Sequence, residues 1–96
     1  MENSKHFLYV VECNDETYYT GYTTNVDRRV QQHNAGKGAK YTRARTPVNC
    51  IYLEEFGTKR EALQAEYAFK QLTRKQKERY MREGKTNDKE PKELFE

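Results

Sequence analysis

Five side chains in the sequence suit one kind of chemistry. They are Tyr9, Tyr19, Arg29, His33 and Glu66. A carboxylate can hold one hydrated Mg²⁺, an arginine can neutralise charge on a phosphorane-like transition state, and an activated phenol can accept a proton from water. The sequence shows no Ser-His-Asp arrangement, no Cys-x-x-Cys pair and no glycine-rich phosphate loop. The set therefore suits phosphodiester cleavage.

Each of these residues also has an ordinary structural interpretation. Tyr9 and Tyr19 can be core aromatics on strands. Arg29 can pair with a surface carboxylate, where an ion pair contributes little stability. His33 can cap the C-terminal end of its helix, and Glu66 can be a solvated helix residue. The face that the two tyrosines are expected to share favours a functional role, whereas both interpretations of His33 stay open.

A β-hairpin is expected to position the tyrosines. Residues 6–13, HFLYVVEC, form a nearly continuous β-prone run, which predicts a central strand covered on both faces. Residues 14–16 supply turn formers, and residues 17–22 resume a pattern of β-branched and aromatic residues. The two runs are therefore predicted to pair as antiparallel neighbours.

The length of the hairpin loop predicts the register of the pair. With residues 14–16 as the loop, Val11 faces Tyr19 and Tyr9 faces Gly21. The two tyrosines then become diagonal neighbours on one face of the sheet. Gly21 leaves an unfilled place beside Tyr9, so we expect a slot with two hydroxyls.

A helix after the hairpin is expected to carry Arg29 and His33. Thr24 or Asn25 can cap its start, and Gly36 can end it. Arg29 and His33 lie one turn apart, beside the apolar stripe that must face the core. We therefore expect both side chains at the boundary between core and solvent.

The remaining segments complete an α+β domain. Residues 37–47, KGAKYTRARTP, are too polar for a core element and are expected to form a basic loop, and residues 48–56 read as a third strand. Thr58 and Thr73 each begin a capping box and hence a helix, the second ending near Met81. The order strand, strand, helix, strand, helix, helix predicts a three-stranded, mainly antiparallel sheet flanked by helices.

Length and composition indicate a single domain. We expect residues 1–82 to form it and residues 83–96 to be a polar, disordered tail. No apolar run reaches the length of a membrane span, and the start lacks the pattern of a secretory leader, so a cytoplasmic protein without membrane contact is expected. Cys13 and Cys50 lack zinc-ligand spacing and are expected to be buried free thiols.

The expected basic loop is a candidate for contacts with nucleic acid. Its cationic and aromatic side chains are Lys37, Lys40, Tyr41, Arg43 and Arg45. Lysines and arginines bind phosphates, and a tyrosine among them can stack on a base. The net charge of +3 permits such binding without requiring it. A purely solvated loop is the open alternative.

The order and spacing of these residues resemble the GIY-YIG nuclease superfamily. Residues 7–9, FLY, stand in the place of its first motif, and residues 19–21, YTG, in the place of its second. Arg29 follows the second motif by eight residues. His33 and Glu66 match the histidine and the metal-binding glutamate of the family. The resemblance covers roughly residues 6–82 and is closest to small stand-alone bacterial members, including the segment HNAGKGAKYTRARTPV.

The resemblance implies an endonuclease that depends on Mg²⁺ (or Mn²⁺) and is built on a three-stranded sheet. The first motif lacks its Gly-Ile pair, and Thr20 replaces the central isoleucine of the second. Both departures fall at positions more typical of packing than of chemistry, so the active set is retained. The late asparagine of some members is not assigned, because Asn87 falls in the expected tail.

Together these features predict a divalent-metal-dependent endonuclease that hydrolyses DNA phosphodiester bonds in DNA repair or processing. Glu66 would bind the metal, Arg29 would stabilise the phosphate, and either tyrosine would accept the proton with support from His33. A basic loop alone makes too few contacts to hold a long regular duplex, so single-stranded or branched DNA should be preferred. The alternative is a non-catalytic nucleic-acid-binding module of a larger repair assembly.

Overall fold

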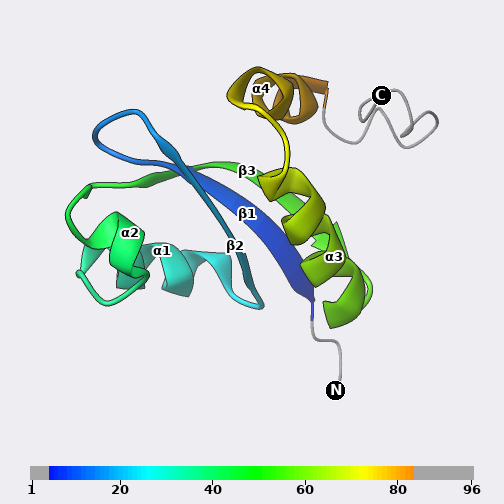
Figure 1. The fold of residues 1–96 in the computed structure, drawn as a ribbon. Coiled ribbons are helices and arrows are strands. Elements are labelled where there is room, and N and C mark those ends of the chain that lie inside the picture. The colour runs from blue at the N-terminus through cyan, green and yellow to red at the C-terminus, as the bar shows by residue number, and fades with distance from the viewer. Residues whose placement is uncertain (1–4, 84–96) are drawn as a thin grey trace.

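Three antiparallel strands form the sheet of this computed structural model, which describes residues 5–83. The central strand β1 (His6–Glu12) pairs with β2 (Tyr18–Thr23) along one edge and with β3 (Asn49–Phe56) along the other. The strand order is therefore β2-β1-β3 (Figure 1). The continuous apolar run of β1 had predicted this central position, and the prediction is confirmed.

Within residues 5–83, four helices flank the sheet. They are α1 (Val26–Asn34), α2 (Lys40–Arg43), α3 (Lys59–Lys70) and α4 (Arg74–Glu83). Figure 1 shows α1 and α2 side by side at one side of the sheet, with α3 at the opposite side. The α+β class and the predicted element order are confirmed. The single-turn helix α2 is an addition, because it lies within the segment expected to be a loop.

Local capping explains where α1 begins and ends. The side chain of Asn25 accepts a hydrogen bond from the backbone N–H of Arg28 at 3.1 Å, which satisfies one of the free donors of the first turn. At the other end Gly36 adopts φ 79°, the left-handed conformation that glycine reaches without a steric penalty. Its N–H donates to the carbonyl of His33, so the helix stops where Gly36 was expected to end it.

Both predicted capping boxes open helices. Thr58 Oγ1 accepts from the backbone N–H of Glu61 at 3.1 Å at the start of α3. At the start of α4 the exchange is reciprocal, because Thr73 Oγ1 accepts from the N–H of Gln76 while Gln76 Oε1 accepts from the N–H of Thr73. Helix α4 ends at Glu83, close to its expected end, and the expected tail from residue 84 onward lies outside the described residues.

Alternate residues of β1 bury two small cores, one on each face of the sheet. Leu8 and Val10 pack with Phe69 of α3 on one face. Tyr9 and Val11 pack on the other face, with Cys13, Val48 and, from α1, Val30. Successive side chains of a strand point to opposite faces of the sheet, so the Tyr9 side chain lies on the face that α1 covers.

One expectation about the cysteines is wrong. Both thiols are free, and Cys13 is buried as expected, but Cys50 is exposed. Cys50 lies on the edge strand β3, next to an irregularity in its pairing with β1 between Val10 and Val11. At the edge of the sheet, β3 has a neighbouring strand on one side only, so its side chains have fewer contacts. Within residues 5–83, no helix combines the length and apolar content needed to cross a membrane.

Candidate active site

The hairpin places the two tyrosines as the sequence predicted. Tyr9 lies opposite Gly21, and Val11 lies opposite Tyr19. The rings of Tyr9 and Tyr19 share one face of the sheet, with their centroids 6.5 Å apart. The predicted register is therefore confirmed.

The expected open slot beside Gly21 is filled by the Tyr9 ring itself. A Cβ atom added at Gly21 would lie 2.6 Å from Tyr9 Oη and 2.7 Å from Tyr9 Cζ. Tyr9 is 1% exposed, so its side chain lies across the backbone of β2 instead of standing away from it. The expectation of an unfilled place was wrong, since pairing register sets which residues are opposite but not the direction of a long side chain. Gly21 is needed for this close approach.

His33 is fully buried, whereas it was expected at the boundary between core and solvent. Its Nε2 lies 2.7 Å from Tyr9 Oη, and its Nδ1 lies 2.7 Å from Thr42 Oγ1. The segment around α2 covers the ring so closely that a Cβ at Gly38 would lie 2.8 Å from His33 Cγ. The ring therefore points into the protein, and its interpretation as a helix cap is wrong.

These contacts form one chain of hydrogen bonds. Arg29 Nε donates to Tyr9 Oη at 3.3 Å, and Thr42 Oγ1 donates to the carbonyl of Ala39 at 3.0 Å. A hydroxyl has a single proton, so Thr42 Oγ1 must accept from Nδ1–H of His33 if it donates to Ala39. The backbone N–H of Ala39 also points at His33 Nδ1, but from 3.4 Å, a weaker contact than the 2.7 Å to Thr42. We therefore assign the proton of Nδ1 to the Thr42 contact, so that Tyr9 O–H donates to the lone pair of His33 Nε2.

Burial and charge keep both members of this pair neutral near pH 7. Burial raises the pKa of the Tyr9 phenol, while a hydrogen bond and the positive charge from Arg29 lower it less, and the charges of Tyr19 and Glu66 raise it further. Burial, aided by the charge of Arg29, lowers the pKa of His33 below its ordinary value of 6.5. A neutral phenol therefore faces a neutral imidazole.

Arg29 forms one end of this chain of hydrogen bonds. Besides its bond to Tyr9, its Nη1 donates to Gln32 Oε1 at 3.0 Å. These two bonds use part of the five N–H groups of a guanidinium. Within residues 5–83, no ion pair joins Arg29 to Asp27 or to another carboxylate, so the remaining donors suit a phosphate.

The carboxylate of Glu66, on α3, already binds a positively charged side chain. Lys70 Nζ lies 2.9 Å from Glu66 Oε2, and the glutamate side chain is only 17% exposed. The charge of Glu66 also raises the pKa of Tyr9, so the carboxylate lies near enough to the phenol for the two to interact electrostatically. Among the described residues, no group of three or more His, Cys, Asp or Glu side chains could hold a metal. The site therefore offers a single carboxylate, placed and oriented for a positive charge.

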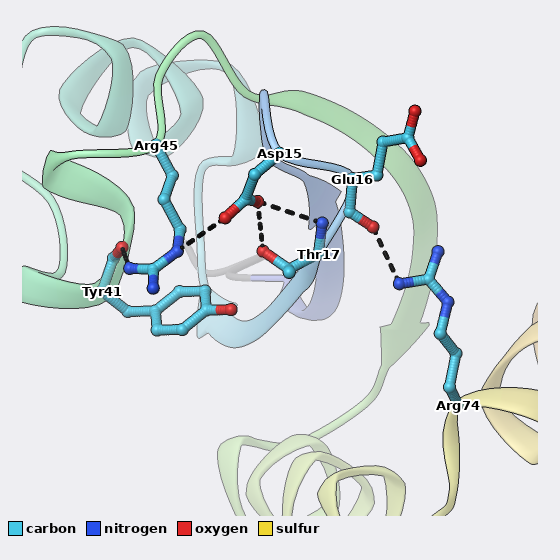
Figure 2. A network of polar contacts seen from close by, with 6 residues as sticks. All are labelled: Asp15, Glu16, Thr17, Tyr41, Arg45 and Arg74. Atoms are coloured by element: carbon cyan, nitrogen blue, oxygen red, sulfur yellow. Dashed lines mark hydrogen bonds and ion pairs between the residues drawn. The ribbon is translucent and has the colours of Figure 1, made fainter.

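The basic segment divides into two parts. Lys37, Lys40 and Arg43 are exposed to solvent. Tyr41 instead stacks on Tyr19, with centroids 6.1 Å apart and planes inclined by 21°. Arg45 covers the Tyr41 ring at 3.9 Å and binds the Asp15 carboxylate at 3.0 Å (Figure 2). The alternative of a purely solvated loop is thus wrong for Tyr41 and Arg45, whose side chains contact other parts of the protein.

Sequence reasoning missed three residues that support the site. They are Gly38, Thr42 and Lys70. Gly38 and Thr42 belong to a polar segment without apolar periodicity, so no local signal predicted that they would enclose His33. The i, i+4 spacing of Lys70 after Glu66 was the one available signal, since such positions are neighbours on a helix.

Comparison with known proteins agrees with this geometry. A family model described as the GIY-YIG catalytic domain matches residues 5–80. A UPF0213 protein of Bacillus cereus is 61% identical over 84 residues, which cover 88% of each chain.

Two solved structures are also similar. The solution structure of EF2693 from E. faecalis is 53% identical, with a TM-score of 0.59, and the match covers 85% of this chain and 88% of that one. The solution structure of the UPF0213 protein BH0048 from Bacillus halodurans is 49% identical, with a TM-score of 0.52 and coverage of 78% and 80%. The relatives therefore share about half or more of the aligned residues, and the solved ones share the fold.

Proposed function

Because the chain belongs to the GIY-YIG catalytic domain family, we propose that it is a divalent-metal-dependent endonuclease that hydrolyses DNA phosphodiester bonds. The observation that carries this proposal is the buried chain of hydrogen bonds through Arg29, Tyr9 and His33, beside the carboxylate of Glu66. This arrangement combines a guanidinium for the phosphate, a phenol with a proton acceptor behind it, and a ligand for a cation.

Glu66 fits the role of metal ligand. Its carboxylate binds the ammonium group of Lys70 in the structure, so this position accepts a positive charge. Mg²⁺ is commonly held by one or two carboxylates, with water and substrate phosphate oxygens completing its shell. Bound there, Mg²⁺ or Mn²⁺ would supply Lewis acidity at the phosphate and lower the pKa of a bound water.

Arg29 is suited to stabilise the transition state. Its guanidinium is fixed by bonds to Tyr9 and Gln32 while further N–H groups stay available. Negative charge that builds up on the phosphate during water attack would then meet donors that need no reorganisation. Arg29 would also hold the phosphate in line with the attacking water.

Tyr9 is the better candidate for the proton acceptor, and His33 explains why. A phenol whose pKa is raised by burial is not a base in its resting state. Tyr9 can take a proton from water as its own proton passes to His33 Nε2, 2.7 Å away. The Tyr19 hydroxyl has no such acceptor among the described residues, and its partly exposed position suits a contact with the phosphate instead.

The substrate we propose is single-stranded or branched DNA, as arises in DNA repair and processing. The exposed cations of the basic segment are Lys37, Lys40 and Arg43. Three phosphate contacts give sequence-independent binding but little grip on a regular duplex. A flexible single strand can instead bend to bring a phosphate to Arg29, next to the buried Tyr9 phenol.

The test is cleavage of three labelled DNA forms by the purified protein. Single-stranded, duplex and branched DNA of equal length are incubated with Mg²⁺, Mn²⁺ or EDTA. We expect cleavage with metal, none with EDTA, and faster cleavage of the single-stranded and branched forms. Binding without cleavage under every metal condition would instead identify a non-catalytic nucleic-acid-binding module of a repair assembly. Sequence-specific cutting of intact duplex would contradict the substrate preference.

A further inference from the structure

A groove runs along the free edge of β2, the edge strand of the sheet. It encloses about 310 Å³. Its lining residues are Tyr18, Tyr19, Thr20, Tyr41, Lys70 and Lys77. One wall comes from α2, and the opposite wall comes from α3 and α4. A larger pocket of about 620 Å³ on α3 involves none of the candidate catalytic residues.

The groove opens directly beside the candidate catalytic residues. Lys70 lines it and also binds Glu66 at 2.9 Å. Tyr19 lines it too, and its ring meets the ring of His33 edge-on at 5.3 Å between centroids. Lys70 therefore joins the groove to Glu66, so a strand bound at Glu66 can extend into the groove.

The lining of the groove is suited to a phosphate group. It contains two ammonium groups and several hydroxyls but no carboxylate. The Lys77 ammonium lies 5.8 Å from the centroid of the Phe69 ring, and in the described part of the chain it has no acidic partner. The hydroxyls of Tyr19 and Tyr41 likewise have no hydrogen bond to another described residue. These groups are free to meet an anion.

Two arginines hold the walls of the groove against the same hairpin turn. From the α2 side, Arg45 Nε binds the Asp15 carboxylate at 3.0 Å, and its Nη1 donates to the Tyr41 carbonyl at 2.7 Å. From the α4 side, Arg74 Nη1 donates to the carbonyl of Glu16 at 2.8 Å. Figure 2 shows the two arginines reaching the turn from opposite sides. The groove is therefore braced before any ligand arrives, which lowers the entropic cost of binding.

We infer that this groove binds a backbone phosphate adjacent to the scissile one, so that a single DNA strand runs from Glu66 along β2 toward the hairpin turn. The identity of the ligand as DNA rests on the proposed function. The volume lies at the low end of the roughly 300–1,000 Å³ of small-ligand sites, which suits one nucleotide unit of a single strand better than a base pair. Lys77 is the specific phosphate contact that this inference adds.

The experiment compares Lys77→Gln with Lys75→Gln on the same helix. Both remove one positive charge, but Lys75 lies in a different surface hollow, beside Arg79 and Arg82. Binding of a fluorescein-labelled single-stranded oligonucleotide is measured by anisotropy in EDTA across a range of salt concentrations. Each lost phosphate contact should flatten the slope of log K against log salt by about 0.7 for a single strand. We expect this change, with weaker binding, for Lys77→Gln alone, and a return to the parent slope for Lys77→Arg.

Equal slopes for the Lys77→Gln and Lys75→Gln proteins would overturn the inference. Far-UV circular dichroism and a thermal melt of each variant test for a folding defect. Lys77→Arg keeps both the positive charge and an aliphatic side chain beside the Phe69 ring, so it should bind like the parent. The binding assay needs no cleavage, so its outcome is separate from that of the proposed function. If the parent protein cuts DNA but Lys77→Gln leaves binding unchanged, only the groove inference is refuted. If Lys77→Gln weakens binding but the parent protein does not cut DNA, only the catalytic proposal is refuted.

Discussion

The hydroxyl of Tyr9 lies 2.7 Å from Nε2 of His33, inside the protein and between residues 24 positions apart in the chain. The bond joins the central strand to α1, and Thr42 continues it into the α2 segment. Residues from β1, α1 and the α2 segment therefore form one chain of hydrogen bonds along which a proton can pass. Any change that shifts the Tyr9 ring should disturb the candidate catalytic centre as a whole.

Gly21→Ala should lower both stability and cleavage. The added methyl group would lie 2.6 Å from Tyr9 Oη, so the ring must shift from its present place beside His33. Overpacking of this kind costs roughly 1–3 kcal/mol. Chemical denaturation and the initial rate of cleavage measure the two effects.

Gly57→Ala is the matched control for this substitution. Its new methyl group would lie 3.6 Å from Glu61 Oε1, an ordinary contact distance. We expect a change in the free energy of unfolding within about 0.5 kcal/mol and an unchanged cleavage rate. If Gly21→Ala were as stable and as active as Gly57→Ala, the close approach of Tyr9 to β2 would be refuted.

Tyr9→Phe and Tyr19→Phe should differ in stability as well as in activity. Loss of the Tyr9 hydroxyl leaves His33 Nε2 buried without a partner, which costs about 1–3 kcal/mol. Loss of the Tyr19 hydroxyl breaks no bond to another described residue, so stability should change little. Cleavage should fall about 10²-fold or more for Tyr9→Phe and less for Tyr19→Phe. The reverse order of activities would make Tyr19 the proton acceptor.

Stability should decline as the pH falls below about 6.5, because of His33. Its pKa is lowered by burial, so between the folded value and the unfolded value of about 6.5 only the unfolded chain binds the extra proton. The contribution is fully present above about pH 6.5, and the free energy of unfolding then drops by up to about 1.4 kcal/mol per pH unit until the folded pKa is reached. Urea unfolding at a series of pH values measures this slope.

Two variants identify the titrating group. His33→Gln should be less stable at all pH values but should lose the slope just below pH 6.5, whereas His6→Gln should keep it. Hydrogen bonds lower the pKa values of Asp15 and Glu78, so those carboxylates lose their contributions only in the more acidic range below about 4. A slope that persists in the His33→Gln protein would show that burial of this imidazole is not its cause.

The structure predicts different effects for cations of the basic segment. Neutralising Lys37, Lys40 and Arg43 together to Gln should weaken DNA binding and flatten its salt dependence, while thermal stability stays near that of the parent. Arg45→Gln should lower thermal stability, because it removes the contact with Tyr41, worth about 0.5–1 kcal/mol, and the bond to Asp15. If the triple variant binds with unchanged affinity and salt slope, those three residues are merely solvated.

The features that the sequence predicted well are those set by short-range rules. A hairpin with a short loop allows one register that keeps its apolar residues buried, so the pairing of Tyr9 with Gly21 followed from the loop length. Capping residues act over three or four positions, and Thr58 and Thr73 therefore marked the starts of α3 and α4.

The features that were missed depend on contacts between distant segments. Burial of His33 requires the α2 segment to fold back over α1, and nothing in the local pattern of residues 37–47 signals that return. The Tyr9 ring fills the place beside Gly21 through its side-chain rotamer, which strand register does not determine. The exposure of Cys50 follows from its place on an edge strand, which only the strand order reveals.

The most direct test of the account is the metal-dependent cleavage rate of Glu66→Gln on a labelled single-stranded oligonucleotide. The substitution removes the negative charge and keeps the shape of the side chain, and loss of the partly exposed pair with Lys70 should cost less than about 1 kcal/mol. Glu55→Gln is the matched control, because that glutamate is exposed on β3 and pairs only loosely with Lys5 at 3.9 Å. We predict that Glu66→Gln cleaves at least about 100-fold more slowly in Mg²⁺ while it folds and binds DNA normally, and that Glu55→Gln matches the parent. Equal metal-dependent rates for the parent and Glu66→Gln proteins would contradict the assignment of this site.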